Sequence, residues 1–403
     1  MASQTLAPPP PRRRSGRSSD SDSSLDDVAK EKRKIAHSSA NNDVRHHHQH
    51  HNERADLKNS AATKRWKTFW SSFRYLQRLT PKQVDDFMGS YVIYNLDWSD
   101  EKQMVAVLGN DYQEKVGDCL KEYYGVLNHL CALGDVEKMY IPPWMSRKAT
   151  VLENQLLYEE LICKDIDLKP DDKVLDLGCG RGRVAAHMTQ YSGGAHVTGL
   201  NIDPDQIEQA RAFTRKQAFP NSFVVQDFNA GPLPFADESF DAFYQIQALS
   251  LCKDIPALFR EVFRVVKPGA KISSLDWVSL PAYDPSNPEH AELMRHVKPL
   301  IGAVGTPTPE SLEKALRDAG FEVLSSGNAS IDGLQAPLIH TVDGYFRAMR
   351  QVILSLVKLH LIPHHFKTLI NRFCLDGLAF IHMDNMRLAT TSYHIVAQKP
   401  DKQ

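Results

Sequence analysis

The 403-residue sequence lacks the features that mark several classes of protein. Its six cysteines stand singly without a CxxC pair, so they outline neither a disulfide framework nor a zinc site. A run of about 18 apolar residues, as in a membrane-spanning helix, is absent, and so is the apolar core of a secretory signal. A formal net charge of -1 argues against a dedicated nucleic-acid-binding protein. These absences predict a cytoplasmic protein with no nucleic-acid partner and no metal site.

The beginning of the chain has a different composition from the rest. Residues 1–60 are rich in proline, serine and charge, as in "APPPPRRRSGRSSDSDSS", which predicts a disordered low-complexity tail. The run "RHHHQHH", Arg45 to His51, would bind divalent ions only weakly, because nothing fixes a coordination geometry. From Trp66 to Leu79, aromatic residues recur at helical spacing among basic ones. This pattern predicts an amphipathic helix packed on the main body or, alternatively, one resting on a membrane surface.

The rest of the chain changes pattern twice. Residues 61–169 predict an N-terminal helical cap, with helices at Glu101 to Leu108 and Asp111 to Leu130. Residues 170–325 alternate short β-compatible runs, such as "KVLDL" and "FDAFYQI", with amphipathic stretches of helical period. Strands that alternate with such helices predict an α/β domain, in which helices cover both faces of a parallel sheet.

The C-terminal part, residues 326–403, contains an apolar helix from Tyr345 to Leu361 and a final strand, "TSYHIVAQ". Three basic residues interrupt the apolar helix. We expect it to form a lid or wall over an apolar substrate. Contact with a membrane surface is the alternative.

The stretch "VLDLGCGRGRV", Val174 to Val184, predicts a ligand-binding turn. Gly178, Gly180 and Gly182 follow a predicted strand and open a helix, where glycine permits a tight turn and close approach of a ligand. Asp176 precedes the turn, and its carboxylate would repel a pyrophosphate but attract a cationic ligand. The lysine of a P-loop is missing, which excludes the usual kinase and ATPase site.

With its neighbours, this turn resembles the first motif of class I S-adenosylmethionine-dependent methyltransferases. The landmarks "VTGLNIDPDQIEQA", "VVQDFNAGPLPFADESFDAFY" and "LFREVFRVVKPGAKI" follow in order. The resemblance implies a Rossmann-like fold with a seven-stranded, mostly parallel sheet, and S-adenosylmethionine as cofactor. It also implies that Asn201 holds the ribose hydroxyls and Asp227 lies near the adenine amine. Asn201 replaces the usual acid, but its amide can still hydrogen-bond a diol.

Downstream, the chain is similar to sterol 24-C-methyltransferases, most specifically at "LDWVSLPAYDPSNPEH", Leu275 to His290. The similarity spans roughly Tyr123 to Pro400. The chain departs from the family pattern after "EYYGVLNH", where "LCALGDVEKMYIPPW" replaces an aromatic substrate motif, and at Gln247 and Leu251, which replace an acid and a histidine. The acidic pair expected near "PLIGAVGTPTP" is also missing. These departures predict a non-standard terpenoid acceptor.

The chemistry of alkene methylation indicates further candidate residues. The reaction forms a carbocation, which aromatic faces stabilise by roughly 0.5–2 kcal/mol each, and a base then removes a proton. Asp276, where the resembling family carries an acid, is the first candidate base and His290 the second, each with a plain structural role as the alternative. Tyr124 is the third candidate catalytic residue. The aromatic candidates, each with core packing as the alternative, are Tyr123, Tyr124, Tyr140, Trp144, Trp277 and Tyr283.

The sequence therefore predicts S-adenosylmethionine-dependent C-methylation of a sterol or related isoprenoid. One alternative is O- or N-methylation of another small apolar metabolite, with His129 as base. A second is a non-catalytic methyltransferase-like scaffold that regulates a partner. We also expect the chain to form a homo-oligomer or to touch a lipid surface, at the endoplasmic reticulum or a lipid droplet.

Overall fold

The computed structural model describes residues 68–134 and 136–402. The expected disordered tail, its histidine run and Trp66 lie outside these residues. Among the residues described, no helix combines the length and the apolar character needed to cross a membrane.

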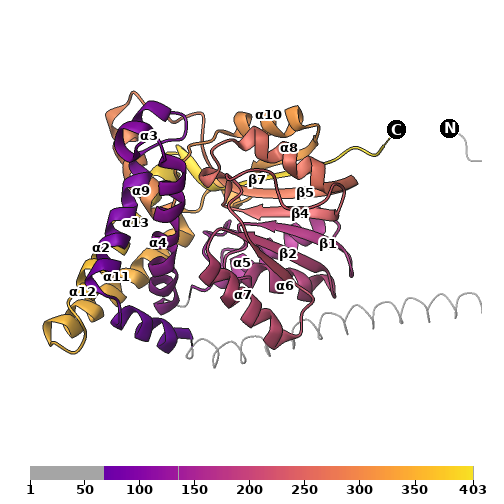
Figure 1. Ribbon diagram of the computed structural model, residues 1–403. Helices are drawn as coiled ribbons and strands as arrows, with labels where there is room; N and C mark the ends of the chain where they lie inside the picture. Colours follow the sequence, from indigo (N-terminus) through magenta and orange to yellow (C-terminus); the bar gives the residue numbers. More distant parts are fainter. Residues whose placement is uncertain (1–67, 135, 403) are drawn as a thin grey trace, which may run out of the picture. The chain divides into compact units, whose positions relative to one another are not determined.

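A seven-stranded sheet forms one layer of the protein (Figure 1). The strand order is β3-β2-β1-β4-β5-β7-β6. Strands β1 to β5 pair in parallel, and β7 runs antiparallel to both β5 and β6. This topology confirms the predicted α/β class with a mostly parallel sheet. The strands are β1 Lys173–Leu177, β2 His196–Asn201, β3 Ser222–Val225, β4 Phe240–Ile246, β5 Val266–Ser279, β6 Glu322–Asn328 and β7 Ala389–Gln398.

Helices cover both faces of this sheet, because successive residues of its central strands point to opposite sides and are both apolar. Val174 of β1 joins a buried cluster with residues of α5, α6 and α7, whereas Leu175 joins a cluster with residues of α8 and α10. The predicted cover of both faces is thus confirmed. These helices are α5 Val151–Asp165, α6 Arg183–Ser192, α7 Pro204–Gln217, α8 Ile255–Val265 and α10 Pro309–Ala319.

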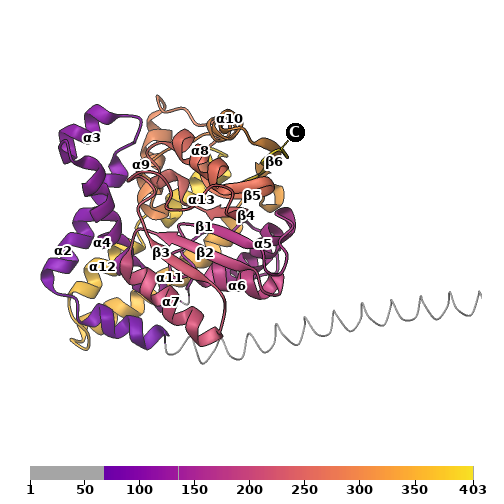
Figure 2. The same cartoon turned by 45° about the vertical axis from the view of Figure 1, so that its right-hand side comes forward.

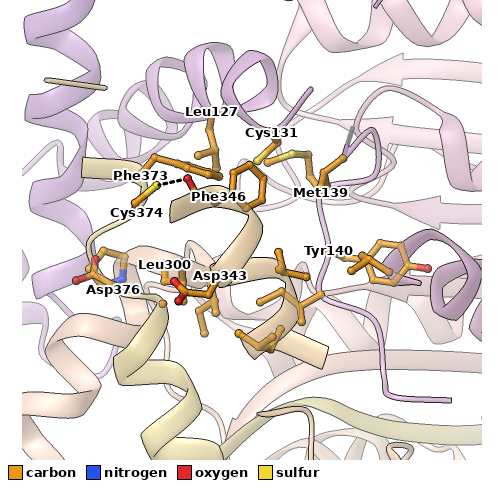
Figure 3. A pocket seen from close by; sticks show the side chains of 18 of the residues that line it. Leu127, Cys131, Met139, Tyr140, Leu300, Asp343, Phe346, Phe373, Cys374 and Asp376 are labelled. Carbon is orange, nitrogen blue, oxygen red and sulfur yellow. Dashed lines mark hydrogen bonds between the residues drawn. The ribbon is translucent and has the colours of Figure 1, made fainter. Parts of the chain in front are cut away.

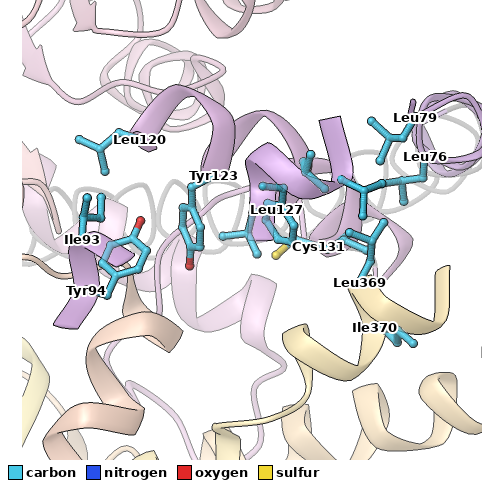
Figure 4. Close-up of a cluster of buried hydrophobic side chains, with 14 of the residues drawn as sticks. Leu76, Leu79, Ile93, Tyr94, Leu120, Tyr123, Leu127, Cys131, Leu369 and Ile370 are labelled. Carbon is cyan, nitrogen blue, oxygen red and sulfur yellow. The ribbon is translucent and has the colours of Figure 1, made fainter. Parts of the chain in front are cut away.

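A second layer, made of helices, stands beside the sheet (Figures 1 and 2). Its core joins segments that are far apart in the sequence: Leu76, Tyr123 and Leu369 belong to one buried cluster (Figure 4). The helices are α2 Pro81–Ser90, α3 Glu101–Leu108, α4 Tyr112–Leu133, α9 Pro288–Ile301, α11 Ala336–Lys358, α12 His365–Phe373 and α13 Gly377–Asn385. Short 3-10 helices are η1 Tyr91–Asn95, η2 Leu249–Leu251 and η3 Ile331–Gly333.

Helices α4 and α11 differ from their predicted extent, since α4 covers Tyr112–Leu133 rather than Asp111 to Leu130. Helix α11 begins at Ala336 rather than Tyr345, with Pro337 in its first turn, where a missing N–H does no harm. Its early residues Leu338 and Ile339 are buried. Helix α9 was not predicted as a helix. It starts after Asn287, whose side chain accepts a hydrogen bond from Glu289 N and caps the first turn.

Residues 68–77 are helical and pack on the helical layer. Leu76 is fully buried, and the Phe73 ring lies 5.6 Å from the Phe366 ring of α12. His365 of α12 also bonds to the Leu76 carbonyl through Nε2, at 2.8 Å. The predicted packing of this helix on the main body is therefore confirmed for its described part.

Replacement of Leu76 tests this packing. We expect Leu76→Ala to lower the free energy of unfolding by about 2–5 kcal/mol, because it removes buried methyl groups and leaves a cavity. Leu324→Ala is the control, since Leu324 is exposed on β6, and should change stability by less than about 0.5 kcal/mol. Urea denaturation of the full chain measures both. Equal, small effects would contradict the packing.

Candidate functional site

The glycine turn after β1 has a backbone that only glycine adopts easily. Gly178, Gly180 and Gly182 have φ of 80°, 51° and 67°. A Cβ on Gly178 would lie 2.9 Å from the Cβ of Ala248, and one on Gly182 would lie 2.9 Å from the Cβ of Ala210. Gly182 is also the N-cap of α6. The turn therefore needs glycine both for its backbone shape and for close packing against Ala248 and Ala210, and it ends at the start of a helix, where anionic or polar ligand groups bind well.

The residues predicted to hold the cofactor lie along one edge of the sheet. Asp176 is in β1, Asn201 ends β2, and Asp227 follows β3. Because these strands are parallel and adjacent, their carboxyl ends meet at the same edge, where α/β proteins bind ligands. Helix α4 passes over this edge: a Cβ on Gly117 would lie 3.3 Å from Ile202 Cδ1 and 3.9 Å from Asp227 Oδ2.

Two of these residues have unmet polar capacity. The side-chain nitrogen of Asn201 is buried and has no hydrogen-bond partner in the part of the chain described. Burial raises the pKa of Asp176 to about 7, although the Tyr244 hydroxyl donates a 2.8 Å hydrogen bond to its Oδ2. A buried carboxyl of this kind gains from a nearby cation, and an unpaired amide gains from an acceptor such as a hydroxyl.

A pocket of about 1190 Å³ of empty space, partly open to solvent, lies within the helical layer and reaches the sheet (Figure 3). Gln247, directly after β4, lines it, so the pocket meets the same sheet edge as the glycine turn. Its lining is mainly apolar and aromatic. The aromatic residues that line it are Tyr91, Tyr123, Tyr124, Tyr140, Phe346 and Phe373.

Three of the six predicted aromatic residues, Tyr123, Tyr124 and Tyr140, thus lie together around the pocket. The other three lie outside the described lining of the pocket. Trp277 is buried and donates from Nε1 to Gly305 O at 3.1 Å; Trp144 lies under Arg147; and Tyr283 stacks with His290.

Gln247 forms hydrogen bonds with Ile141, which lines the pocket, and with Thr391 of β7. Its Nε2 donates to the carbonyls of Ile141 and Thr391 at 2.7 and 2.9 Å, and its Oε1 accepts from Ile141 N at 3.0 Å. Its φ of 55° lies in the left-handed region. A carboxylate here could not donate to the two carbonyls, which explains physically why an amide replaces the expected acid.

Glu159 of α5 binds two residues that line the pocket, Lys138 and Tyr140. It is fully buried, and the Lys138 ammonium and the Tyr140 hydroxyl each donate to its Oε1 at 2.7 Å. His187 Nδ1 lies 2.7 Å from its Oε2. Burial alone would raise the pKa of Glu159, but the charge of Lys138 and the hydrogen bonds outweigh it and hold the pKa below its usual value.

The glycine turn also contacts the wall of the pocket. Arg181 donates to the carbonyl of Glu137 at 3.0 Å, and Arg183 pairs with the Glu137 carboxylate at 3.3 Å. We call residues 136–141 the pocket wall. The sequence did not predict that Gln247, Glu159 and Arg181 would hold the pocket wall. The two arginines within "GRGR" were a local signal for an acidic partner.

Asp276 lies in β5 and is almost fully buried. Its carboxylate accepts from Leu249 N at 2.7 Å and from Trp277 N at 2.8 Å, which anchors the loop after β4. Burial nevertheless raises the pKa of Asp276 to about 7. The pKa of Tyr124 is raised first by burial and then by the charge of Asp276.

The two histidine candidates have protein partners. His290 accepts a hydrogen bond at Nδ1 from Asp284 N, at 3.1 Å, and lies outside the described lining of the pocket. His129 Nδ1 lies 3.0 Å from Ser72 Oγ, and its ring stacks on Tyr75 at 3.9 Å. Burial lowers the pKa of His129 to about 4, so it is neutral and weakly basic at neutral pH.

Comparison with known families defines the class of this site. Residues 175–273 match the family model described as "Methyltransferase domain". The glycine turn, Asn201, Asp227 and Gln247 all fall within this match. This part of the chain is therefore a methyltransferase domain, as its motifs predict.

Particular relatives narrow the comparison. The chain is 32% identical to botryococcene C-methyltransferase from Botryococcus braunii over 227 residues. This aligned region covers 55% of this chain and 59% of that protein. It is 30% identical over 200 residues to sterol 24-C-methyltransferase from Pneumocystis carinii (strain B80), covering 48% and 51%. The chain thus spans between half and three fifths of the length of these relatives.

A solved structure agrees on the fold. The cyclopropane synthase MmaA2 from Mycobacterium tuberculosis superposes with a TM-score of 0.54 at 13% identity, covering 65% of this chain and 90% of that one. The likeness confirms the Rossmann-like architecture predicted from the sequence.

The domain match indicates S-adenosylmethionine as the cofactor, and the residues present fit it. The glycine turn offers bare backbone, Asp176 offers a buried carboxyl that a cation would stabilise, and Asn201 offers an unpaired donor. We propose that Asp176 faces the cationic end of the cofactor, Asn201 its ribose hydroxyls, and Asp227 its adenine amine. When bound, the cofactor supplies an electrophilic methyl group.

The pKa of Asp176 makes this assignment testable. In the absence of ligand, the protonated carboxyl contributes stability that is complete below its unfolded-state pKa of about 3.9 and is lost as the pH rises through about 7. A cation binds the ionised form, so affinity for S-adenosylmethionine should rise with pH until about 7, by up to about tenfold per pH unit.

Calorimetric titration on both sides of pH 7 measures this dependence. Asp176→Asn should bind more weakly above pH 7 and show a flat profile. Asp276→Asn is the matched control, because the pKa of Asp276 is also raised to about 7, and it should keep the slope. Equal affinity of wild type and Asp176→Asn at every pH would show that Asp176 does not face the cofactor.

Proposed function

We propose that the protein transfers a methyl group from S-adenosylmethionine to a carbon atom of a sterol or related isoprenoid. The observation that carries the proposal is the aromatic, largely apolar pocket that reaches, through Gln247, the same sheet edge as the glycine turn. The printed names of the two curated relatives, a botryococcene and a sterol 24-C-methyltransferase, support the same class of acceptor.

Aromatic rings supply what a carbon nucleophile needs. An acceptor double bond becomes cationic as it gains the methyl group, and the faces of Tyr123 and Tyr124 would stabilise that charge by roughly 0.5–2 kcal/mol each. The apolar lining also keeps water from the cation. Tyr123 is held in place by its hydroxyl, which donates to Pro299 O at 2.9 Å.

Proton removal completes the reaction in this proposal. Tyr124 lines the pocket, and the charge of the buried Asp276, whose pKa is raised to about 7, acts on its hydroxyl. Tyr124 would accept the acceptor's proton at its hydroxyl oxygen while its own proton passes toward Asp276. We favour Asp276 over His290, because the charge of Asp276 acts on Tyr124, a residue of the pocket lining, whereas His290 stacks on Tyr283 outside the described lining.

The polar groups of the pocket favour an acceptor with one hydroxyl. Near the sheet, Gln247 and Tyr140 use their polar atoms on protein partners. In the view of Figure 3, Asp343 lies on the other side of the pocket from Tyr140. Asp343 Oδ2 is buried and accepts no hydrogen bond within the described residues, although Arg347 Nε lies 2.8 Å away as an ion pair. A terminal hydroxyl, as in a sterol, would donate to it.

An acceptor panel tests the function directly. Purified full-length protein, radiolabelled methyl-S-adenosylmethionine and acceptors such as zymosterol, cycloartenol, squalene and a prenylated phenol are combined, and products are resolved by mass. We expect base-stable label in a sterol or isoprenoid product. Label only in ethers, esters or amines would replace C-methylation by O- or N-methylation. Cofactor binding without any transfer would support a non-catalytic scaffold instead.

Substitutions at Tyr124 separate the ring from the hydroxyl. Tyr124→Leu should lower kcat by roughly 2- to 30-fold through loss of cation stabilisation alone, and further if the hydroxyl carries the proton. Tyr124→Phe keeps the ring, so any loss there reports the hydroxyl. Tyr283→Leu is the control, since Tyr283 lies outside the described lining and should leave kcat unchanged. Full activity of Tyr124→Leu would exclude Tyr124 from the reaction.

A further inference from the structure

The outer face of α11 carries an apolar stripe. Tyr345, Val352 and Leu359 follow one another at intervals of seven residues, close to two helical turns, so they lie along one line. Their exposed fractions are 53%, 60% and 65%. Ala348 and Ser355, on the same side of the helix, are exposed as well. This line, the α11 stripe, has no charged side chain.

Basic residues run beside the α11 stripe. Arg347 and Lys358 are exposed on an adjoining line of the same helix, and Lys367 is exposed on α12. The acidic residues between 336 and 378 are Asp343 and Asp376, and both are buried. Arg347 pairs with the buried Asp343, so the positive charge of this region that is exposed without an ion pair among the described residues comes from Lys358 and Lys367.

Further exposed leucines border the substrate pocket. Leu361 lies in the loop between α11 and α12, and Leu375 and Leu378 lie around the start of α13. Leu375 follows Cys374, and Leu378 follows Gly377, and both Cys374 and Gly377 line the pocket. Exposed leucines thus directly follow, in the chain, two residues that line the pocket.

We propose that the α11 stripe, with Leu361, Leu375 and Leu378, docks on the surface of an anionic phospholipid bilayer. Apolar side chains on one line of a helix enter the boundary between head groups and acyl chains, and lysine and arginine beside them meet anionic head groups. In Figure 1 the loop between α11 and α12 lies at the end of the helical layer away from the sheet, where a flat surface can reach it.

Docking on a bilayer would bring the pocket close to acceptors dissolved in lipid. A sterol or isoprenoid dissolves in lipid rather than water, and entry beside Leu375 and Leu378 would let it pass from the bilayer into the pocket without crossing water. Passage of an acceptor from bilayer to pocket rests on the proposed function, whereas the α11 stripe and its flanking charges do not. Vesicle binding can therefore be tested without cofactor or acceptor.

Sedimentation of the full chain with vesicles tests the proposal. Binding to phosphatidylcholine mixed with phosphatidylserine should exceed binding to phosphatidylcholine alone and fall with added salt. Val352→Ser combined with Leu359→Ser should weaken binding by on the order of tenfold. Lys358→Gln combined with Lys367→Gln should do so by a similar factor and remove much of the salt dependence.

A matched pair of residues elsewhere provides the control. Val107 on α3 and Leu324 on β6 are exposed to 50% and 46%, and Val107→Ser with Leu324→Ser should bind vesicles like wild type. Circular dichroism and thermal unfolding verify that each variant folds. Equal loss in both serine pairs would overturn the proposal. So would unchanged vesicle binding together with a shift from dimer to monomer in Val352→Ser/Leu359→Ser, since the stripe would then contact a second copy.

Failure of the proposed function has a different signature. Methyl transfer to detergent-dispersed acceptor needs no bilayer, so its absence beside normal vesicle binding would count against the function alone. Normal transfer in detergent, without stripe-dependent vesicle binding, would count against the docking surface alone.

Discussion

The buried carboxylate of Glu159 is the constraint on which the pocket depends. A carboxylate without solvent is stable only when cations and hydrogen-bond donors surround it, and breaking such a buried pair typically costs about 3–5 kcal/mol. Lys138 and Tyr140 meet this need from the pocket wall, and His187 meets it from α6. One buried anion thus joins the wall to the helix that starts at the glycine turn. The shape of the acceptor pocket and the position of the cofactor turn are consequences of the same charge.

The two halves of the site meet because of strand direction. Parallel strands bring Asp176, Asn201 and Gln247 to one edge, although they are far apart in the chain. Helix α4 then spans both halves: Gly117 lies over the cofactor residues, and Tyr124 faces the pocket. The helical layer therefore covers the carboxyl edge of the sheet rather than forming an independent unit. Its apolar side chains line the pocket and so determine which molecules fit there.

Much of this arrangement follows from local sequence patterns. The glycine turn after β1 and the helix limits of α3 were predictable, because glycine spacing, caps and apolar period are local signals. The bonds of Gln247 were not, because its partners Ile141 and Thr391 are set by the tertiary fold alone. The sequence also could not show that Tyr124 lines the pocket whereas Trp277 lies in the core. Both are aromatic residues predicted near the site, and only tertiary packing distinguishes their positions.

The way Gln247 holds the wall bears on how such a protein changes its acceptor. Residues 136–141, the pocket wall, form no strand, and Ile141 is held by the Gln247 side chain, so no backbone ladder depends on their identity. Substitutions at Val136, Met139 or Ile141, which leave the partners of Glu159 in place, would reshape the pocket while the glycine turn and the seven strands keep their register. Acceptor choice and cofactor use can accordingly diverge at different rates in this architecture, with a few residues of the wall serving as the adjustable part.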